Sequence, residues 1–192
     1  MFFHFHTDDD IDNDFNAKLR SMRCVAVKKD GVRCKRNTVI GQEYCYSHRE
    51  SILNLRIQDS TIANAGKGLF AVGYPDKIIF KKDARICKYN GEVIDEEELD
   101  DRYGEFTAPY GIKLYNDLYE DAGVFRGIGA MANHSGNQRK INAKLSVGRD
   151  NRAQLKAIKN IKGGQEIVVN YGNRYNFNED VCTSTNRLKY TC

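Results

Sequence analysis

The sequence predicts a mainly β protein with short helices, in which a small cysteine-rich module precedes one larger domain. From Ile52 onward, short β-like runs are broken by Gly, Asn and Asp at close intervals, a pattern typical of strands joined by tight turns. Before that point, a segment with few large apolar residues contains three cysteines and a histidine. A chain of 192 residues is long enough for one modest core and such an appendage.

The first seventeen residues are predicted to form a flexible acidic tail, because five aspartates and no Lys or Arg fall within residues 1–16. The whole chain carries 30 basic and 26 acidic residues, so the body behind this tail is basic and favours acidic partners. No apolar run approaches the roughly 20 residues that a membrane span needs. We expect a cytosolic or nuclear protein without a membrane partner, whose cysteines are thiols or metal ligands, not disulfides.

Residues 18–50 are predicted to form a zinc-stabilised module. Nine, ten and two residues separate the four ligands of a Cys3His set, which suits tetrahedral Zn2+: Cys24, Cys34, Cys45 and His48. Gly31 and Gly41 supply tight turns before two of the cysteines. The gaps are longer than a Cys-x2-Cys knuckle, and a linker with ordinary thiols is the alternative. Basic residues in the module could bind nucleic acid or an acidic protein face. The alternative is that the module is only a structural cap, whose basic residues face solvent.

Residues 52–177 are predicted to form the main domain, and residues 178–192 a polar tail. The expected strands lie at residues 68–72, 78–80, 85–89, 141–147 and 153–157. The best helix candidate is the segment at residues 95–103, because its first turn is acidic and favours the positive end of the helix dipole.

Four short blocks of the main domain occur in a suggestive order. They are Asn64-Ala-Gly-Lys-Gly-Leu-Phe-Ala71, Tyr89-Asn-Gly-Glu92, Gly127-Ile-Gly-Ala-Met-Ala-Asn-His-Ser135 and Gly164-Gln-Glu-Ile-Val-Val-Asn-Tyr-Gly172. Together they resemble the signature of SET-domain protein lysine methyltransferases. The resemblance implies the SET-domain fold, with small β-sheets around a knot-like core, and S-adenosyl-L-methionine as cofactor. The second block matches a family strand.

The resemblance also assigns roles to individual residues. It implies that the cofactor is bound by Gly66, Lys67, Gly68, Asn133, His134 and Tyr171. It implies that the Tyr171 hydroxyl reaches the transferred methyl group, and that Tyr89 and Tyr175 line the channel for the substrate lysine. In a strand, alternation would put Val169 on the same face as Tyr171. Valine leaves room in such a channel, but the number of methyl groups transferred stays open.

The chain departs from the common family form at five positions: Ala130, Met131, Ala132, Gly136 and Asn170. In these departures it resembles the compact SET proteins of large DNA viruses. The C-terminal tail offers only Cys182 and Cys192, so we expect no zinc site after the SET domain. Tyr175 with the tail, or a second subunit of a homodimer, is then expected to close the channel.

The sequence therefore predicts a protein-lysine N-methyltransferase that acts on a histone tail. Two alternatives stay open. One is a methyltransferase for a non-histone or viral protein, with the zinc module as substrate adaptor. The other is an inactive SET and zinc-finger protein that binds chromatin or nucleic acid, although the intact Tyr171 and Asn133-His134 argue against it.

Overall fold

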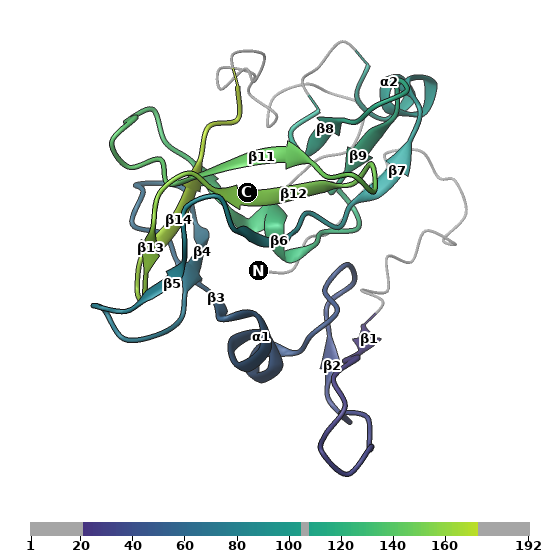
Figure 1. Cartoon of the computed structure of the whole chain (residues 1–192). Coiled ribbons are helices and arrows are strands. Elements are labelled where there is room, and N and C mark those ends of the chain that lie inside the picture. Colours follow the sequence, from purple (N-terminus) through teal and green to yellow (C-terminus); the bar gives the residue numbers. More distant parts are fainter. Residues whose placement is uncertain (1–20, 105–107, 173–192) are drawn as a thin grey trace.

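The computed structural model describes residues 21–104 and 108–172, and it confirms a mainly β fold with few short helices (Figure 1). The predicted acidic tail, Tyr175 and the C-terminal tail lie outside these residues. Within them, neither α-helix has the length and apolar character that a membrane crossing requires. The helices are α1 (Tyr46–Leu53), α2 (Glu96–Tyr103) and the short 3₁₀ helix η1 (Ile128–Met131).

Fourteen short strands are formed by the described residues. In chain order they are β1 (Met22–Arg23), β2 (Asn37–Thr38), β3 (Leu55–Asp59), β4 (Lys67–Ala71), β5 (Ile78–Phe80), β6 (Arg85–Lys88), β7 (Glu92–Ile94), β8 (Gly111–Lys113), β9 (Tyr119–Asp121), β10 (Asn133–His134), β11 (Ala143–Val147), β12 (Ala153–Ala157), β13 (Ile161–Lys162) and β14 (Glu166–Val169). The five strands predicted at residues 68–72, 78–80, 85–89, 141–147 and 153–157 are present as β4, β5, β6, β11 and β12, with ends that are unchanged or shifted by at most two residues.

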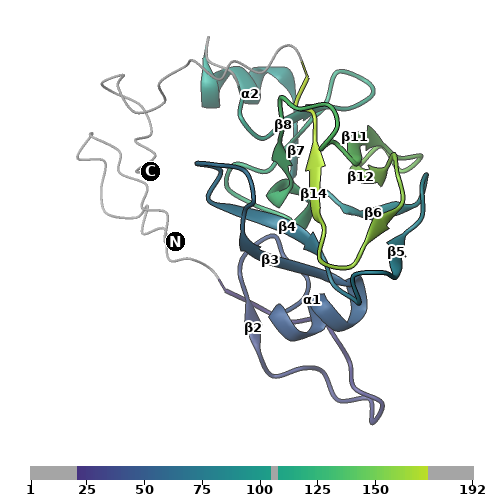
Figure 2. The same ribbon diagram turned by 90° about the vertical axis from the view of Figure 1, so that its left-hand side faces the viewer.

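The N-terminal module is joined to the main domain by a helix. The strands β1 and β2 pair antiparallel, and α1 then runs across the predicted border between residues 50 and 52. Leu53 at its end packs against the main core, and Leu55 in β3 is fully buried there. Figure 2 shows α1 lying against β3. Gly41 also touches the domain, because a Cβ there would lie 2.7 Å from the Arg126 backbone.

One four-stranded sheet collects segments that are far apart in the chain. Its strand order is β10-β14-β4-β3, with β10 parallel to β14 and the other pairs antiparallel. Asn133 lies opposite Val168, and Leu69 lies opposite Ile167. Three of the four sequence blocks therefore meet in one sheet, around fully buried side chains such as Leu55, Leu69 and Ile167.

The three-stranded sheet β11-β12-β6 contributes Leu155 and Ala157 to this core, whereas the sheet β7-β9-β8 lies beside a second buried cluster that includes Leu114 and Ala122. The helix predicted at residues 95–103 is confirmed as α2, and the Asp95 side chain caps it by accepting from the Glu98 backbone N–H at 2.9 Å. The expectation of a strand across Tyr89–Glu92 is wrong in detail. Asn90 has a left-handed φ of 59°, which separates β6 from β7, and β7 begins only at Glu92.

Candidate active site and metal centre

The glycine-rich block forms a tight backbone cradle at the start of β4. Gly66 has φ +63°, and a Cβ there would meet no atom within 4 Å, so the cradle is open on that side. A Cβ on Gly68 would lie 2.3 Å from the Glu166 carboxylate, so a larger residue there would displace that carboxylate. The Asn133 side-chain N–H donates to the Lys67 carbonyl at 3.0 Å and to Glu166 Oε1 at 3.2 Å. The structure thus brings Gly66, Lys67, Gly68 and Asn133 together, as the sequence blocks predicted.

Glu166 is the organising residue that sequence reasoning missed. Its carboxylate accepts hydrogen bonds from the Ser60 hydroxyl at 2.6 Å, the Thr61 N–H at 2.8 Å, the Thr61 hydroxyl and the Asn133 amide. Burial opposes ionisation of this group, but the hydrogen bonds from Ser60 and Thr61 outweigh it and lower the pKa of Glu166. One sequence feature could have indicated this role: Glu166 is a carboxylate directly before the apolar run Ile167-Val-Val169 of one strand.

We expect Glu166→Gln to destabilise the protein by about 1–3 kcal/mol, because an amide N–H₂ would face donors that now find an acceptor. Urea unfolding followed by circular dichroism measures this change in the free energy of unfolding. The matched control is Glu97→Gln on the exposed face of α2, which should change that free energy by less than about 0.5 kcal/mol. Equal effects in the two variants would contradict the organising role.

Tyr171 is fixed at both ends by the segment that contains Asn133 and His134. Its backbone N–H donates to His134 Nδ1 at 3.1 Å, and its hydroxyl donates to the Ala132 carbonyl at 3.0 Å. The two ring centroids lie 5.4 Å apart. The strand β14 ends before Tyr171, at Val169, yet both residues line one cavity. Parallel pairing of β10 with β14 produces this arrangement, because it aligns His134 with Val169.

We expect His134 to titrate below its ordinary pKa of about 6.5, because burial disfavours the charged ring. The folded state then binds the proton less readily than the unfolded state. The stabilising contribution of His134 is complete above pH about 6.5 and is lost as the pH falls through 6.5 towards the lowered folded value. Protonated Nδ1 can no longer accept the Tyr171 N–H.

NMR titration of the His134 ring, assigned by difference from His134→Gln, measures this midpoint. The Tyr171 amide signal should shift with the same midpoint, whereas the Tyr115 amide, which donates to the Asn151 side chain, should not. A midpoint of 6.5 or higher would contradict the expectation.

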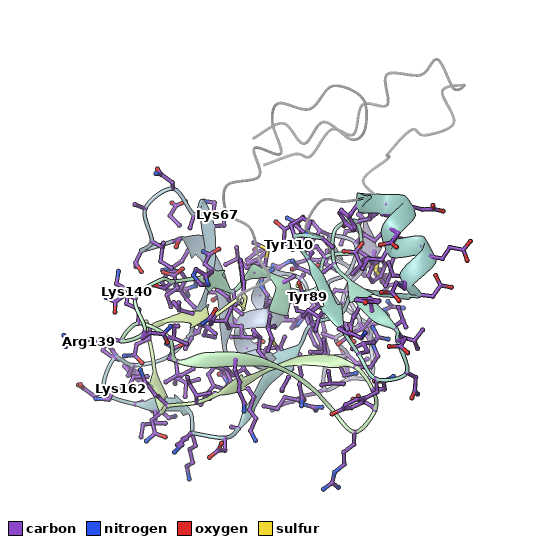
Figure 3. The ribbon with its side chains drawn as sticks, turned by 90° about the horizontal axis from the view of Figure 1, so that it is seen from above. Lys67, Tyr89, Tyr110, Arg139, Lys140 and Lys162 are labelled. Carbon is purple, nitrogen blue, oxygen red and sulfur yellow. The ribbon has the colours of Figure 1, made fainter. Side chains whose placement is uncertain are left out.

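A narrow cavity of about 40 Å³ lies beside Tyr171 and is lined by tyrosines and small residues. Figure 3 shows two of the tyrosines, Tyr89 and Tyr110, close together in the middle of the domain. The Tyr89 hydroxyl donates to the Tyr110 carbonyl at 3.1 Å, and burial raises the pKa of Tyr89, so this hydroxyl stays protonated. The small residues that line this cavity include Ala130 and Ala132, two positions at which the chain departs from the common family form. Predicted Tyr175 lies outside the described residues.

Tyr110 and the ion pair between Glu120 and Arg152 were not predicted. The Arg126 guanidinium stacks 3.8 Å above the Tyr110 ring, which fixes that wall of the cavity. The fully buried Glu120 accepts from Arg152 at 2.9 Å and from the Gly91 N–H at 2.8 Å. These bonds hold the turn that follows Tyr89. Sequence gave little signal for them, because the partners lie tens of residues apart.

A wider groove of about 510 Å³ adjoins the narrow cavity and shares four lining residues with it: Gly111, Ile112, Leu145 and Tyr171. The groove lies between β8 and β11, and each of these strands is at the edge of its sheet among the described strands. Backbone N–H and C=O groups on an edge strand are able to pair with an added extended peptide.

The four predicted metal ligands converge in the N-terminal module. Their ligand atoms all lie within 4.8 Å of one another, and the three cysteines are buried. The sulfur atoms of Cys24 and Cys45 lie 3.5 Å and 3.4 Å from His48 Nδ1. Tetrahedral zinc with ordinary bond lengths requires ligand separations of about 3.5–3.8 Å, so these two distances are close to those of a zinc site, and the residue types suit the ion. Gly31 and Gly41 have φ of +79° and +86°, consistent with the predicted turns.

Comparison with known proteins agrees with this geometry. The family model described as SET domain matches residues 66–172, more than half of the chain. The Variant-silencing SET domain-containing protein of Plasmodium falciparum (isolate 3D7) is 28% identical over 172 residues, 82% of this chain and 6% of that protein. Histone-lysine N-methyltransferase mes-4 of Caenorhabditis elegans is 29% identical over 162 residues, 74% and 18% of the two chains. The chain therefore spans a small part of these relatives.

A shorter match has higher identity. Histone-lysine N-methyltransferase, H3 lysine-36 specific, of Mus musculus is 34% identical over 104 residues, which cover 52% of this chain and 4% of that protein. These three relatives are not viral, and the likeness to viral SET proteins stays a prediction from the motifs.

Solved structures share the fold. The polycomb repressive complex 2 (PRC2) crystal structure from Chaetomium thermophilum matches with a TM-score of 0.53 and 23% identity, over 70% of this chain and 18% of that chain. The structure titled "ctPRC2 in an autoinhibited conformation bound to S-adenosylmethionine" has a TM-score of 0.50 and 24% identity, over 63% and 15%. Because the family match runs from the glycine cradle through Tyr171 and the fold agrees with it, this chain belongs to the SET domain family.

Proposed function

We propose that this protein is an S-adenosyl-L-methionine-dependent protein-lysine N-methyltransferase. One observation carries the proposal: Tyr171 is bonded to His134 beside the glycine cradle and also lines the narrow tyrosine cavity. A group bound in the cradle and a side chain in the cavity would therefore meet at Tyr171. Relatives named histone-lysine N-methyltransferases, and a shared fold with a complex solved with S-adenosylmethionine, support the proposal.

The cradle residues suit the methionine end of the cofactor. Backbone groups of Gly66, Lys67 and Gly68, the Asn133 amide oxygen and the His134 segment would hold it. The Asn133 oxygen accepts no hydrogen bond from the described residues, whereas its N–H₂ is used to anchor Lys67. The cofactor supplies a methyl group on a positively charged sulfur.

The tyrosine cavity suits a substrate lysine. An amine with an ordinary pKa near 10.4 cannot attack while it is protonated. A dry cavity with aromatic walls and a nearby positive charge both disfavour the ammonium form, so the lysine would enter and react as the neutral amine. Tyr171 donates its hydroxyl hydrogen to Ala132, which leaves the oxygen to receive weak C–H···O contacts from the methyl group. The remaining task is alignment of nitrogen and methyl carbon at about 3–3.5 Å.

The groove beside the cavity suits an extended peptide. Its lining includes Lys113 and Lys144, and the acidic charge that would attract a basic peptide lies on the neighbouring helix α2. The helix α2 and its N-cap residue expose six acidic residues: Asp95, Glu96, Glu97, Glu98, Asp100 and Asp101. Its Leu99 side chain lies near Gly111, which lines both the cavity and the groove. We therefore propose a lysine in a basic histone tail as the substrate, with the tail added as a strand at β8 or β11.

Incubation with methyl-labelled cofactor and separated core histones, then with a non-histone extract, tests this function. Label on a histone lysine, lost in Tyr171→Phe, supports the proposal. Label on other proteins alone would retain the methyltransferase and replace its substrate. Measurable cofactor binding without transfer to any protein would favour the inactive binding protein and refute the proposal.

We also propose that the cluster of Cys24, Cys34, Cys45 and His48 binds structural Zn2+. The buried cluster of the module contains four residues, and three of them are these cysteines. Without a bound metal ion, the module would have little apolar packing to stabilise it.

A further inference from the structure

The outer face of the β11-β12-β6 sheet carries cations in a row across three neighbouring strands. Lys144 on β11 lies opposite Lys156 on β12, and Lys156 lies opposite Arg85 on β6. Lys88 stands in the next row, opposite Gln154. We call these four residues, Lys144, Lys156, Arg85 and Lys88, the basic stripe. The alternate residues of β11 and β12, such as Leu145 and Leu155, point inward to the core.

This arrangement costs stability within the protein itself. Like charges directly opposite each other on paired strands repel. Among the described residues, the one carboxylate within 4 Å of the stripe is Asp83, at 3.8 Å from the Lys156 ammonium, and it is largely exposed. Lys144, Arg85 and Lys88 form no ion pair with described residues. The repulsion is therefore not relieved by this part of the chain, and an external anion would relieve it.

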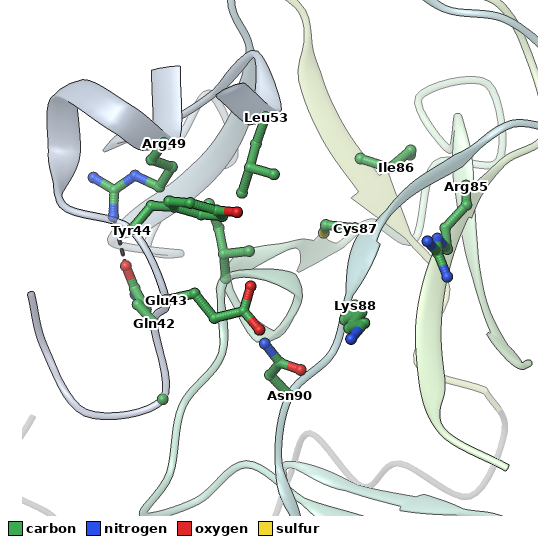
Figure 4. A pocket seen from close by; sticks show the side chains of 12 residues that line it. Gln42, Glu43, Tyr44, Arg49, Leu53, Arg85, Ile86, Cys87, Lys88 and Asn90 are labelled. Atoms are coloured by element: carbon green, nitrogen blue, oxygen red, sulfur yellow. Dashed lines mark hydrogen bonds between the residues drawn. The ribbon is translucent and has the colours of Figure 1, made fainter. Parts of the chain in front are cut away.

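The stripe continues into a cavity of about 270 Å³ between β6 and the N-terminal module. Figure 4 shows Arg85 and Lys88 along one side and Arg49 of α1 across from them. The Arg49 guanidinium donates to Gln42 at 2.6 Å, but its Nε is buried without a partner among the described residues. One carboxylate, Glu43, faces these three cations. The positive surface therefore spans the sheet and reaches the module.

We propose that the basic stripe binds the phosphate backbone of a nucleic-acid duplex. The outer positions of the sheet carry Lys, Arg, Ser and Gln and no aromatic ring, so they lack the stacking groups that single strands require. Long cationic side chains on one face of a sheet suit an array of phosphates and carry no base specificity. Figure 3 shows further cations, Arg139, Lys140 and Lys162, along the side of the domain away from α2.

The stripe lies on the other face of its sheet from the proposed lysine cavity. Leu145, which lines that cavity, points inward between the outward-pointing Lys144 and Ser146. The groove reaches the β11 end of the stripe, because Lys144 lines it, whereas Lys156, Arg85 and Lys88 do not. A duplex held by these three residues would leave the lysine cavity open. This inference is independent of the proposed catalytic function.

The test measures binding of fluorescent 20-base-pair DNA and RNA duplexes to the full chain over a range of salt, without cofactor. In Arg85→Gln/Lys88→Gln/Lys156→Gln we expect about 10–100-fold weaker binding near physiological salt, and a slope of log K against log salt reduced by about 2–3. The control Lys28→Gln/Lys29→Gln/Lys35→Gln removes the same charge from the module and should lose less than about threefold. The melting temperature of the stripe variant should be unchanged or higher, because repulsion is removed, so lost binding would not reflect unfolding.

Binding of either duplex that depends on the stripe supports the proposal, and the two duplexes show which nucleic acid is preferred. Equal losses in both variants would mean non-specific attraction to net charge and would overturn it. It would also be overturned if the stripe variant bound like the unmodified protein, or if a polyglutamate peptide competed as well as a duplex of equal charge. Because no step requires turnover, failure here leaves the methyltransferase proposal unaffected, and the reverse also holds.

Discussion

Replacing Tyr171 with phenylalanine should lower kcat for lysine methylation by about 10²–10³-fold, equivalent to roughly 3–4 kcal/mol of barrier. The hydroxyl donates to the Ala132 carbonyl and stands where the cradle and the tyrosine cavity meet. Its loss would remove the fixed oxygen at the methyl group and the bond that orients the ring. The backbone N–H of residue 171 would still donate to His134, so the cofactor dissociation constant should change less than about threefold.

Labelled-methyl transfer to a histone tail peptide and calorimetric titration with cofactor measure these two quantities. The matched control is Tyr115→Phe, which removes a hydroxyl from an exposed tyrosine and should leave both unchanged. Turnover by Tyr171→Phe within threefold of the unmodified protein would refute the proposed role. Parallel losses of turnover and cofactor affinity would instead indicate that Tyr171 only shapes the cofactor site.

Replacing Cys45 with serine should abolish zinc binding and unfold the N-terminal module. Cys45 precedes α1 and lies next to His48, so one residue supplies a ligand and begins the helix that joins the module to the domain. Structural zinc contributes about 10–16 kcal/mol of apparent binding free energy in small finger peptides, far more than this module's few buried apolar side chains. Metal analysis should fall from about one zinc per chain to nearly none, and trypsin should cut rapidly at the basic residues of the module.

The control for this variant is Cys87→Ser, which changes a buried thiol outside the cluster. It should retain the zinc and the protease resistance of the module, although it will destabilise the core of the main domain. Full zinc content in Cys45→Ser would exclude Cys45 as a ligand.

The sequence alone located the local chemistry of this protein. Four ordered blocks indicated the SET family, and the fold and the family match confirm it. The acidic first turn predicted α2, and short β-like runs between Gly, Asn and Asp predicted β11 and β12. The cysteine spacing predicted a ligand set that does converge. These features are encoded by residues close together in the chain, where propensity and spacing act directly.

Contacts between distant segments were decided by the tertiary structure. Glu166 reaches Ser60 across 106 positions, and Glu120 holds Gly91 across 29, so neither bond leaves a local pattern. The continuation of the module into the domain through α1 also depends on packing, because the partly buried Leu53 at the end of α1 packs against the main core. The motif residues can therefore be recognised in the sequence, whereas the distant residues that hold them in position cannot.

Strand register decided the rest. Parallel pairing of β10 with β14 places His134 beside Tyr171, and the pairing of β11, β12 and β6 aligns Lys144, Lys156 and Arg85 in one row. A shift by one residue would turn each side chain to the opposite face. That choice is made by burial of Leu145 and Leu155 against the core, a free energy that exists only once the sheets have packed.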